Sequence, residues 1–181
     1  RLSNEHRVSL VAFSEETAEI IDLRPYVTDG ILRFRVPSGN YVIREYLVTD
    51  EKERDGANYL SYEASMGYLR AVFSLFADTF APYLGETLNT VSYSGLGFNG
   101  CNRRNWDASF DECFLKRFGF DPSPYYPALF GGIGKETEHI KACFMTVRAS
   151  LLQNGILRAL SDFAAELGLQ TFGNLSEPKL T

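Results

Sequence analysis

The sequence predicts an α/β fold, consisting of an incomplete (β/α) TIM-barrel segment preceded by a small β-rich region. Residues 1–40 contain short runs rich in β-branched and aromatic residues, which favour strands. From residue 41 onward strand and helix patterns alternate, which is typical of parallel sheets. The 181 residues are fewer than the ~250 of a complete barrel. We therefore expect a β-rich region at 1–40 and a partial barrel domain at 41–181.

The first fifty residues predict four short strands. The third alternates apolar residues with arginines, which places one face inward and one in water. The segment 37–40, Pro-Ser-Gly-Asn, predicts a tight connection, so we expect the third and fourth strands to form a hairpin. The runs are Val8 to Phe13, Ala18 to Leu23, Ile31 to Val36 and Tyr41 to Val48.

An amphipathic helix is predicted next, with Ser61 as its N-cap and Gly85 as its end. Its apolar residues recur at three- and four-residue spacing, which is typical of a helix packed on one side. A short strand at 90–93 and a loop with three glycines at 94–100 follow. The apolar stripe consists of Leu69, Val72, Phe73, Phe76, Phe80 and Leu84.

The last third of the chain predicts two further helices and a strand. Asp107 can cap a helix that ends at Gly119. A long helical pattern runs over 137–167 with a bend at Asn154-Gly155, and a strand follows at 169–172. We expect the strands at 41–48, 90–93 and 169–172 to be the parallel ones. A doubly wound open sheet fits the same order, but no G-x-G-x-x-G or P-loop opens any helix.

Composition excludes several classes of partner. The net charge is -5, and the absence of a basic run argues against nucleic acid or an anionic membrane surface. No stretch of ~18 consecutive apolar residues exists, so we expect no membrane span. Residues 1–7 lack the apolar centre of a secretory signal. Cys101, Cys113 and Cys143 have neither zinc-site nor disulfide-framework spacing, so we interpret them as small apolar residues and expect no metal ligands.

Three segments carry distinctive motifs: Asn105-Trp106-Asp107 with Phe118 to Leu129 (FGFDPSPYYPAL), Asp22-Leu23 with Leu32 to Tyr41 (LRFRVPSGNY), and Gly173 to Glu177 (GNLSE). In their order and spacing they resemble the α-L-rhamnosidase-like glycoside hydrolases of glycoside hydrolase family 106. The resemblance implies an interior fragment of a longer, inverting glycosidase that acts on plant or bacterial polysaccharide or oligosaccharide. It also implies a periplasmic or secreted location. No cofactor is implied, although some members hold calcium near the active site.

One departure from the family concerns its acidic residues. The family places carboxylates on the strand before the W-T/D segment, whereas residues 91–98 contain none. Either the alignment slips within this loop or an acid is lost or relocated. The alternative function is therefore a non-catalytic carbohydrate-binding or structural β/α domain.

Three carboxylates are catalytic candidates, since glycoside hydrolysis needs an acid together with a base or nucleophile. Glu177 lies just beyond the last predicted strand and matches the family's loop, so we expect it to be the general base. Asp107 is either an N-cap or catalytic. Glu45 lies among apolar residues of a predicted strand, and if buried it would have a raised pKa and could act as an acid.

Four further residues are candidates for binding the sugar. Trp106 is the only tryptophan and suits either ring stacking or anchoring of its loop. Tyr93, Asn99 and Asn174 lie at predicted strand ends, where hydroxyl and amide groups can bind sugar hydroxyls. Because three strands cannot close a barrel, we also expect contact with missing parts of the parent chain or with a second copy of this chain.

Overall fold

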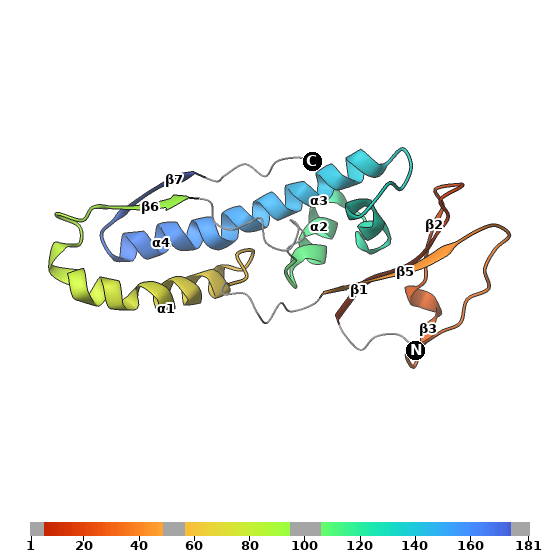
Figure 1. The fold of residues 1–181 in the computed structure, drawn as a ribbon, viewed down its shortest axis with the longest axis horizontal. Helices are drawn as coiled ribbons and strands as arrows, with labels where there is room; N and C mark the ends of the chain where they lie inside the picture. The colour runs from red at the N-terminus through yellow and green to blue at the C-terminus, as the bar shows by residue number, and fades with distance from the viewer. Residues whose placement is uncertain (1–5, 49–56, 95–105, 175–181) are drawn as a thin grey trace. The chain divides into compact units, whose positions relative to one another are not determined.

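The computed structural model describes residues 6–48, 57–94 and 106–174 (Figure 1). Its contacts divide the chain into two compact units that alternate along the sequence. Unit 1 consists of residues 1–54 and 108–147, and unit 2 consists of residues 55–107 and 148–181. Each unit is therefore built from two separate stretches of chain.

The sheet of unit 1 has three antiparallel strands in the order β2-β1-β5. They are β1 (His6–Phe13), β2 (Ile20–Asp22) and β5 (Val42–Val48). Residues 8–13 of β1 are all buried, as suits the central strand of a sheet covered on both faces. A second, two-stranded ladder follows the 3-10 turn η1 (Arg24–Tyr26) and pairs β3 (Val27–Thr28) with β4 (Ile31–Leu32).

Aromatic side chains form the helical core of unit 1. Its elements are α2 (Phe110–Phe118), the 3-10 segment η4 (Ser123–Leu129) and the part of α3 (Thr137–Leu152) up to residue 147. The rings of Phe114 and Phe144 lie 5.0 Å apart, and that of Tyr126 lies 5.1 Å from Phe144. The helix α2 ends at Gly119, as predicted, where a left-handed residue donates its N–H to the carbonyl of Leu115.

Unit 2 packs α1 (Tyr62–Phe80) against α4 (Arg158–Glu166). Its other elements are η2 (Ala81–Tyr83), β6 (Thr90–Ser94), the π-helical turn η5 (Gln153–Leu157) and β7 (Gln170–Asn174). The buried cluster contains Met66, Leu69, Ile156, Ala159 and Leu160. The predicted cap is confirmed, because Oγ of Ser61 accepts from the amide of Ala64 at 3.3 Å.

The long helical pattern bends where the sequence predicted. Gly155 lies inside η5 with a non-helical ψ of −106°. A Cβ at this position would lie 2.4 Å from the carbonyl oxygen of Tyr59. The next amide, that of Ile156, donates to the same carbonyl at 3.0 Å. The bend therefore brings two stretches of backbone closer together than any other residue type would allow.

The predicted partial barrel is wrong. The strand at 41–48 is β5, which pairs antiparallel with β1, so β6 and β7 are the only two named strands that pair in parallel among the described residues. The predicted hairpin between the third and fourth runs is also wrong. The Asp29-Gly30 turn instead joins β3 to β4, and β5 pairs with β1. Both turn residues have positive φ, 51° and 70°, as a two-residue hairpin loop requires. The division at residue 40 stays a prediction.

Candidate functional site

The carboxyl edge of the β6–β7 pair is the candidate site. The parallel register places Tyr93 opposite Gly173 and Ser94 opposite Asn174. Both strands therefore run in the same direction, and their carboxyl ends lie side by side (Figure 1). Ligands of parallel α/β sheets bind outside the carboxyl ends of strands, where loops carry the reacting groups.

A close contact between the strands positions Tyr93. Its side chain is half-buried and packs on the core of unit 2. A Cβ at position 173 would lie 2.5 Å from three ring atoms of Tyr93, so only glycine leaves room for the ring. Sequence reasoning singled out Tyr93 but not Gly173 as a site residue. A single glycine within a strand is the signal that could have indicated this close approach.

The remaining predicted residues of this edge are only partly described. The backbone of Asn174 ends β7 opposite Ser94. Glu177 and Asn99 lie outside the described residues, so their predicted roles stay predictions. Cys101 also lies outside the described residues, whereas Cys143 is buried in α3, where burial raises the pKa of its thiol.

Asp107 is bound to the segment that precedes α1. Its Oδ2 accepts from Nδ2 of Asn58 at 2.6 Å, and Oδ1 of Asn58 accepts from the amide of Leu60 at 3.1 Å. Both Asp107 and its neighbour Trp106 are half-buried. The N-cap position of α2 is Ser109, two residues beyond the predicted cap. These two bonds thus give Asp107 a bracing contact within unit 2.

Glu45 lies in unit 1 and belongs to an ion pair. It faces Leu10 across the β1–β5 ladder, and its Oε1 accepts from Nε of Arg7 at 2.5 Å. Its side chain is half-buried and is held in a charge-assisted bond across the sheet. Glu45 therefore has a structural contact, and its catalytic role stays a prediction.

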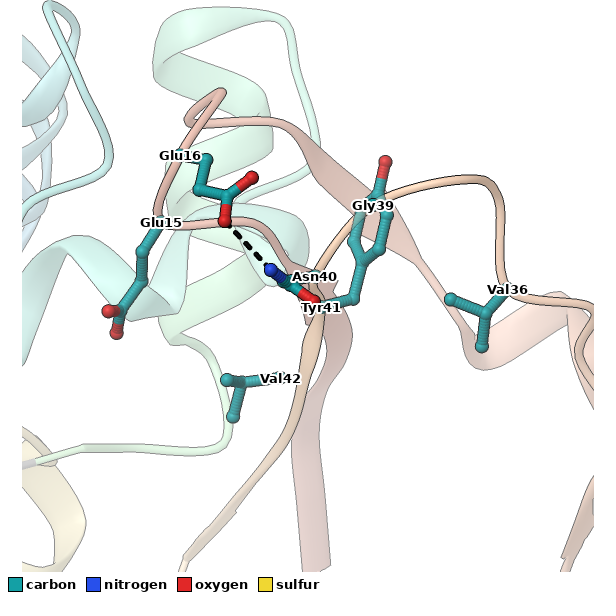
Figure 2. A pocket seen from close by; sticks show the side chains of 7 residues that line it. All are labelled: Glu15, Glu16, Val36, Gly39, Asn40, Tyr41 and Val42. Atoms are coloured by element: carbon teal, nitrogen blue, oxygen red, sulfur yellow. Dashed lines mark hydrogen bonds between the residues drawn. The ribbon is translucent and has the colours of Figure 1, made fainter.

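A shallow cleft of about 380 Å³ lies on unit 1 (Figure 2). The polar part of its lining consists of Glu15, Glu16 and Asn40, and the apolar part of Val36, Val42 and the ring of Tyr41. The segment after β1 supplies the two glutamates, and the segment leading into β5 supplies the other side. Sequence reasoning did not identify this cleft, because its two sides are separated by some twenty residues of chain.

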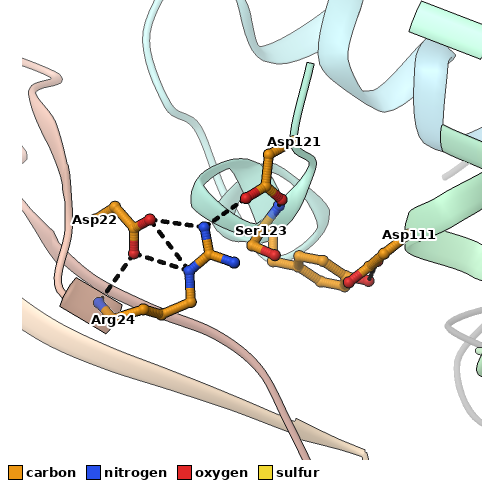
Figure 3. A network of polar contacts seen from close by, with 6 residues as sticks. Asp22, Arg24, Asp111, Asp121 and Ser123 are labelled. Atoms are coloured by element: carbon orange, nitrogen blue, oxygen red, sulfur yellow. Dashed lines mark hydrogen bonds and ion pairs between the residues drawn. The ribbon is translucent and has the colours of Figure 1, made fainter. Parts of the chain in front are cut away.

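A second polar cluster of unit 1 is centred on Arg24 (Figure 3). Its guanidinium donates to both oxygens of Asp22 and, through Nη2, to Oδ2 of Asp121 at 2.5 Å. The bonds with Asp22 are the largest influence on the pKa of Arg24, which is raised. Burial acts to raise the pKa of Asp121, but the bonds from Arg24 and from the amide of Ser123 outweigh it, so this pKa lies below its usual value.

The Arg24 cluster gives a structural role to two aspartates of the segments that resemble the family. Asp22 and Asp121 belong to two of the segments on which the family resemblance rests, and one arginine joins them. In the same region the hydroxyl of Tyr126 donates to Oδ1 of Asp111 at 2.6 Å. Because these groups satisfy one another, they stabilise the joint between sheet and helices of unit 1 rather than offer a reactive group.

The described residues contain no group of three or more His, Cys, Asp or Glu side chains arranged to hold a metal ion. In the same ranges, no helix has the length and apolar character needed to cross a membrane.

Comparison with known proteins shows a likeness in fold to a solved structure. No family model matches the sequence, and no curated protein matches it. Among solved structures, the chain is similar to a rhamnosidase from Novosphingobium sp. PP1Y, with a TM-score of 0.58 and 21% identity. The match covers 86% of this chain and 16% of that one, so this chain spans about a sixth of that length. The chain thus shares the fold of one part of that structure.

Proposed function

We propose that this chain is a piece of a longer glycoside hydrolase, of the α-L-rhamnosidase-like class of glycoside hydrolase family 106. The observation that carries the proposal is the parallel β6–β7 pair, whose carboxyl ends meet, in a chain that shares the fold of part of a rhamnosidase. The quoted motifs support the same class. The substrate would be a plant or bacterial polysaccharide or oligosaccharide, met in the periplasm or outside the cell.

The proposed reaction is hydrolysis with inversion. Water forms a bond to the anomeric carbon as the glycosidic C–O bond breaks, a base carboxylate takes the water proton, and an acid gives a proton to the leaving oxygen. We assign the base to Glu177, which follows the carboxyl end of β7 by three residues. Of the other two predicted carboxylates, Asp107 contacts Asn58 and Glu45 contacts Arg7.

We assign sugar binding to the side chains of Tyr93, Asn174, Asn99 and Trp106. The ring of Tyr93 is held by unit 2, with Gly173 beside it. Asn174 follows on β7, and Asn99 and Trp106 come from the segment after β6. Aromatic rings bind the C–H faces of sugars and amides bind their hydroxyls, which is the reason for this set.

A non-catalytic carbohydrate-binding domain is the second candidate. The observation that favours it is the composition of β6, Thr-Val-Ser-Tyr-Ser, which carries no carboxylate. A domain that had lost its acid would still offer the aromatic and amide groups of the edge. It would bind sugar without turnover.

We also propose that unit 2 packs against a further part of a longer protein or against a second copy. The support is exposed apolar surface on α1, where Val72 of the predicted packed stripe is 52% exposed and Leu75 is 77% exposed. On β7, Phe172 is 74% exposed. Exposed apolar side chains that gather on one surface mark a site of contact with another surface.

The test uses the full-length protein that carries this chain, assayed on an aryl α-L-rhamnoside. Replacing Glu177 with Gln removes the basic oxygen while keeping the shape, so turnover should fall by roughly 10²–10⁴, the usual contribution of general base catalysis. The matched control is Glu166→Gln, which removes only an exposed ion pair with Arg70. Full turnover in Glu177→Gln would show that Glu177 is not the general base. A parent that binds rhamnosides without cleaving them would select the binding domain instead.

A further inference from the structure

The cleft of unit 1 is lined partly by apolar and partly by polar side chains. Its volume of about 380 Å³ falls within the ~300–1,000 Å³ of small-molecule sites. One part is apolar, with Val36 50% and Val42 49% exposed on either side of the ring of Tyr41 (Figure 2). The other part presents carboxylates and an amide. A ligand that fits both has an apolar face and several hydrogen-bond donors.

The ring of Tyr41 is a fixed platform. It packs against the buried cluster of Leu10, Ala12 and Leu23. Its hydroxyl donates to Oε2 of Glu19 at 2.6 Å, and this bond is the main cause of the raised pKa of Tyr41. The ring is therefore held at its core side and at its tip, and a fixed ring binds a partner at a low cost in conformational entropy.

Gly39 keeps one side of the platform open. Its φ of +128° is a conformation that residues with a side chain rarely adopt. A Cβ at this position would contact Cε2 of Tyr41 at 3.4 Å. Glycine therefore permits the turn into residue 40 and leaves the space beside the ring for another molecule.

Internal bonds orient the polar side of the cleft. Nδ2 of Asn40 donates to Oε1 of Glu16 at 2.8 Å, and Nη2 of Arg44 donates to Oε1 of Glu15 at 3.0 Å. Each bond uses one carboxylate oxygen, and a carboxylate offers about four acceptor sites in all. Both glutamates thus retain capacity for donors from a ligand.

We propose that this cleft binds a neutral sugar ring, with a C–H face on Tyr41 and hydroxyl groups that donate to Glu15 and Glu16. A sugar presents an apolar face and a set of donors on one rigid ring, which matches both parts of the lining. A small ammonium ion would satisfy the carboxylates but would leave Val36, Tyr41 and Val42 unused. The site goes beyond the proposed function, because the cleft belongs to unit 1 and the carboxyl edge of β6 and β7 to unit 2.

The test is a titration of the ¹⁵N-labelled protein with L-rhamnose, D-glucose and D-galactose, followed by NMR. We expect saturable shifts at the amides of residues 15–16 and 39–42 for at least one sugar. The Kd should be on the order of 1–10 mM, as suits a ligand of a dozen heavy atoms in an open cleft. No saturable shift at these amides up to about 100 mM of any of the three sugars would overturn the proposal.

Substitutions of Tyr41 and Val36 test whether the sugar binds on the ring of Tyr41. Tyr41→Phe keeps the ring and should bind within about twofold of the parent, whereas Tyr41→Ala should weaken binding about tenfold. Because Tyr41 also packs on the core, Val36→Ser serves as a second variant on an exposed side chain, and we expect it to weaken binding about threefold. If Val36→Ser and a folded Tyr41→Ala both bind sugar with the affinity of the parent, then the sugar does not pack on the ring of Tyr41 and the proposal is overturned.

The effect of removing one negative charge from the cleft distinguishes a sugar site from an amine site. n-Butylammonium is the competing probe, and Glu16→Gln is the variant, because it removes a charge and keeps an acceptor. We expect the sugar to lose at most about threefold in Glu16→Gln. Tighter binding of n-butylammonium than of every sugar, abolished in this variant, would show a cation site and overturn the proposal. Neither readout depends on rhamnoside turnover, so failure here is distinguishable from failure of the proposed function.

Discussion

Arg24 donates to Asp121 across 97 residues of sequence, with Nη2 2.5 Å from Oδ2. The same guanidinium binds Asp22 two residues before it. The sheet strand β2 and the segment that leads into η4 are thereby joined by one cation. Asp121 also accepts from the amide of Ser123 at 2.9 Å, so this joint fixes the start of η4. The contact is one that neither segment specifies alone.

Replacing Arg24 with Gln should lower the stability of the protein. The guanidinium joins two carboxylates, and its removal leaves both without their cation. The side chains of Arg24 and Asp121 are 36% and 49% exposed, so solvent screening limits the expected loss to about 1 kcal/mol. Denaturant unfolding measures it. The control is Lys141→Gln, which removes an exposed pair with Glu138 and should cost less than about 0.5 kcal/mol. Equal losses in both variants would contradict a specific role for Arg24.

The contribution of Asp121 should depend on pH in acid. Its pKa is lower in the folded protein than its usual value, so the unfolded chain binds the proton more readily. The stabilisation is therefore complete above about pH 4, the usual Asp pKa, and is lost as the pH falls through the lower folded pKa. Unfolding of the parent and of Asp121→Asn, compared from pH 7 to pH 2.5, should show a difference that shrinks below about pH 4. A constant difference over this range would show that the charge of Asp121 is not its source.

Gly155→Ala should destabilise unit 2 severely. The added Cβ would meet the carbonyl of Tyr59 at 2.4 Å and the backbone of Leu60 at 2.9 Å, and backbone atoms cannot turn aside as a side chain can. We expect a loss of about 3 kcal/mol or more, at the upper end of overpacking effects. The control is Gly67→Ala in α1, where an added Cβ meets nothing within 4 Å. It should stabilise the helix by about 0.5–1 kcal/mol. Similar unfolding midpoints for the two variants would contradict the close approach at the π-helical turn.

Local features of the fold were predictable, and strand pairing was not. Ser61 and Gly119 act within one helical turn of their own positions, so the sequence around them is sufficient. The strand at 42–48 was recognisable from its residues. Its partner β1 lies some thirty residues away, and the apolar and polar pattern of a strand does not determine which other strand it pairs with. The Asp29-Gly30 pair was a local signal for a hairpin at 27–32 that could have corrected the predicted one.

The candidate site shows the same limit. Tyr93 could be placed at a strand end from sequence, because the strand pattern stops there. The role of Gly173 required the parallel register, which pairs residues 80 positions apart. The contacts of Asp107 and Glu45 with Asn58 and Arg7 are also non-local, and a sequence pattern of carboxylates does not reveal which of them already has a partner.

Gly173→Ala should displace the ring of Tyr93. The Cβ of the new alanine would lie 2.5 Å from Cγ, Cδ1 and Cδ2 of Tyr93. These ring atoms are close to the backbone of Tyr93, so they cannot move without a change of rotamer. The expected cost is about 1–3 kcal/mol, with large NMR shifts along β6. Gly131→Ala adds the same methyl group where nothing lies within 4 Å and should leave both quantities unchanged. A Gly173→Ala protein with parent stability and parent shifts at residues 90–94 would disprove the close contact.

The two roles open to Asp107 predict different results for conservative replacement. Oδ2 of Asp107 accepts from Asn58 at 2.6 Å, and Asn58 in turn accepts from the amide of Leu60 before α1. We expect this bracing contact to be the main role. Asp107→Asn keeps an acceptor oxygen for Asn58, so it should retain stability within about 0.5 kcal/mol, whereas Asp107→Ala should lose about 1 kcal/mol.

Coupling to Asn58 gives the decisive measurement. If the two side chains stabilise unit 2 through one bond, then the loss in the Asn58→Ala, Asp107→Ala double variant is smaller than the sum of the single losses. In the full-length protein, Asp107→Asn should then keep rhamnoside turnover within about threefold of the parent, because bracing does not need the charge. A fall of roughly 10² or more in Asp107→Asn, with the unfolding midpoint unchanged, would instead make Asp107 a catalytic carboxylate. Additive stability losses would show that the bond to Asn58 contributes little, and the bracing role would be abandoned.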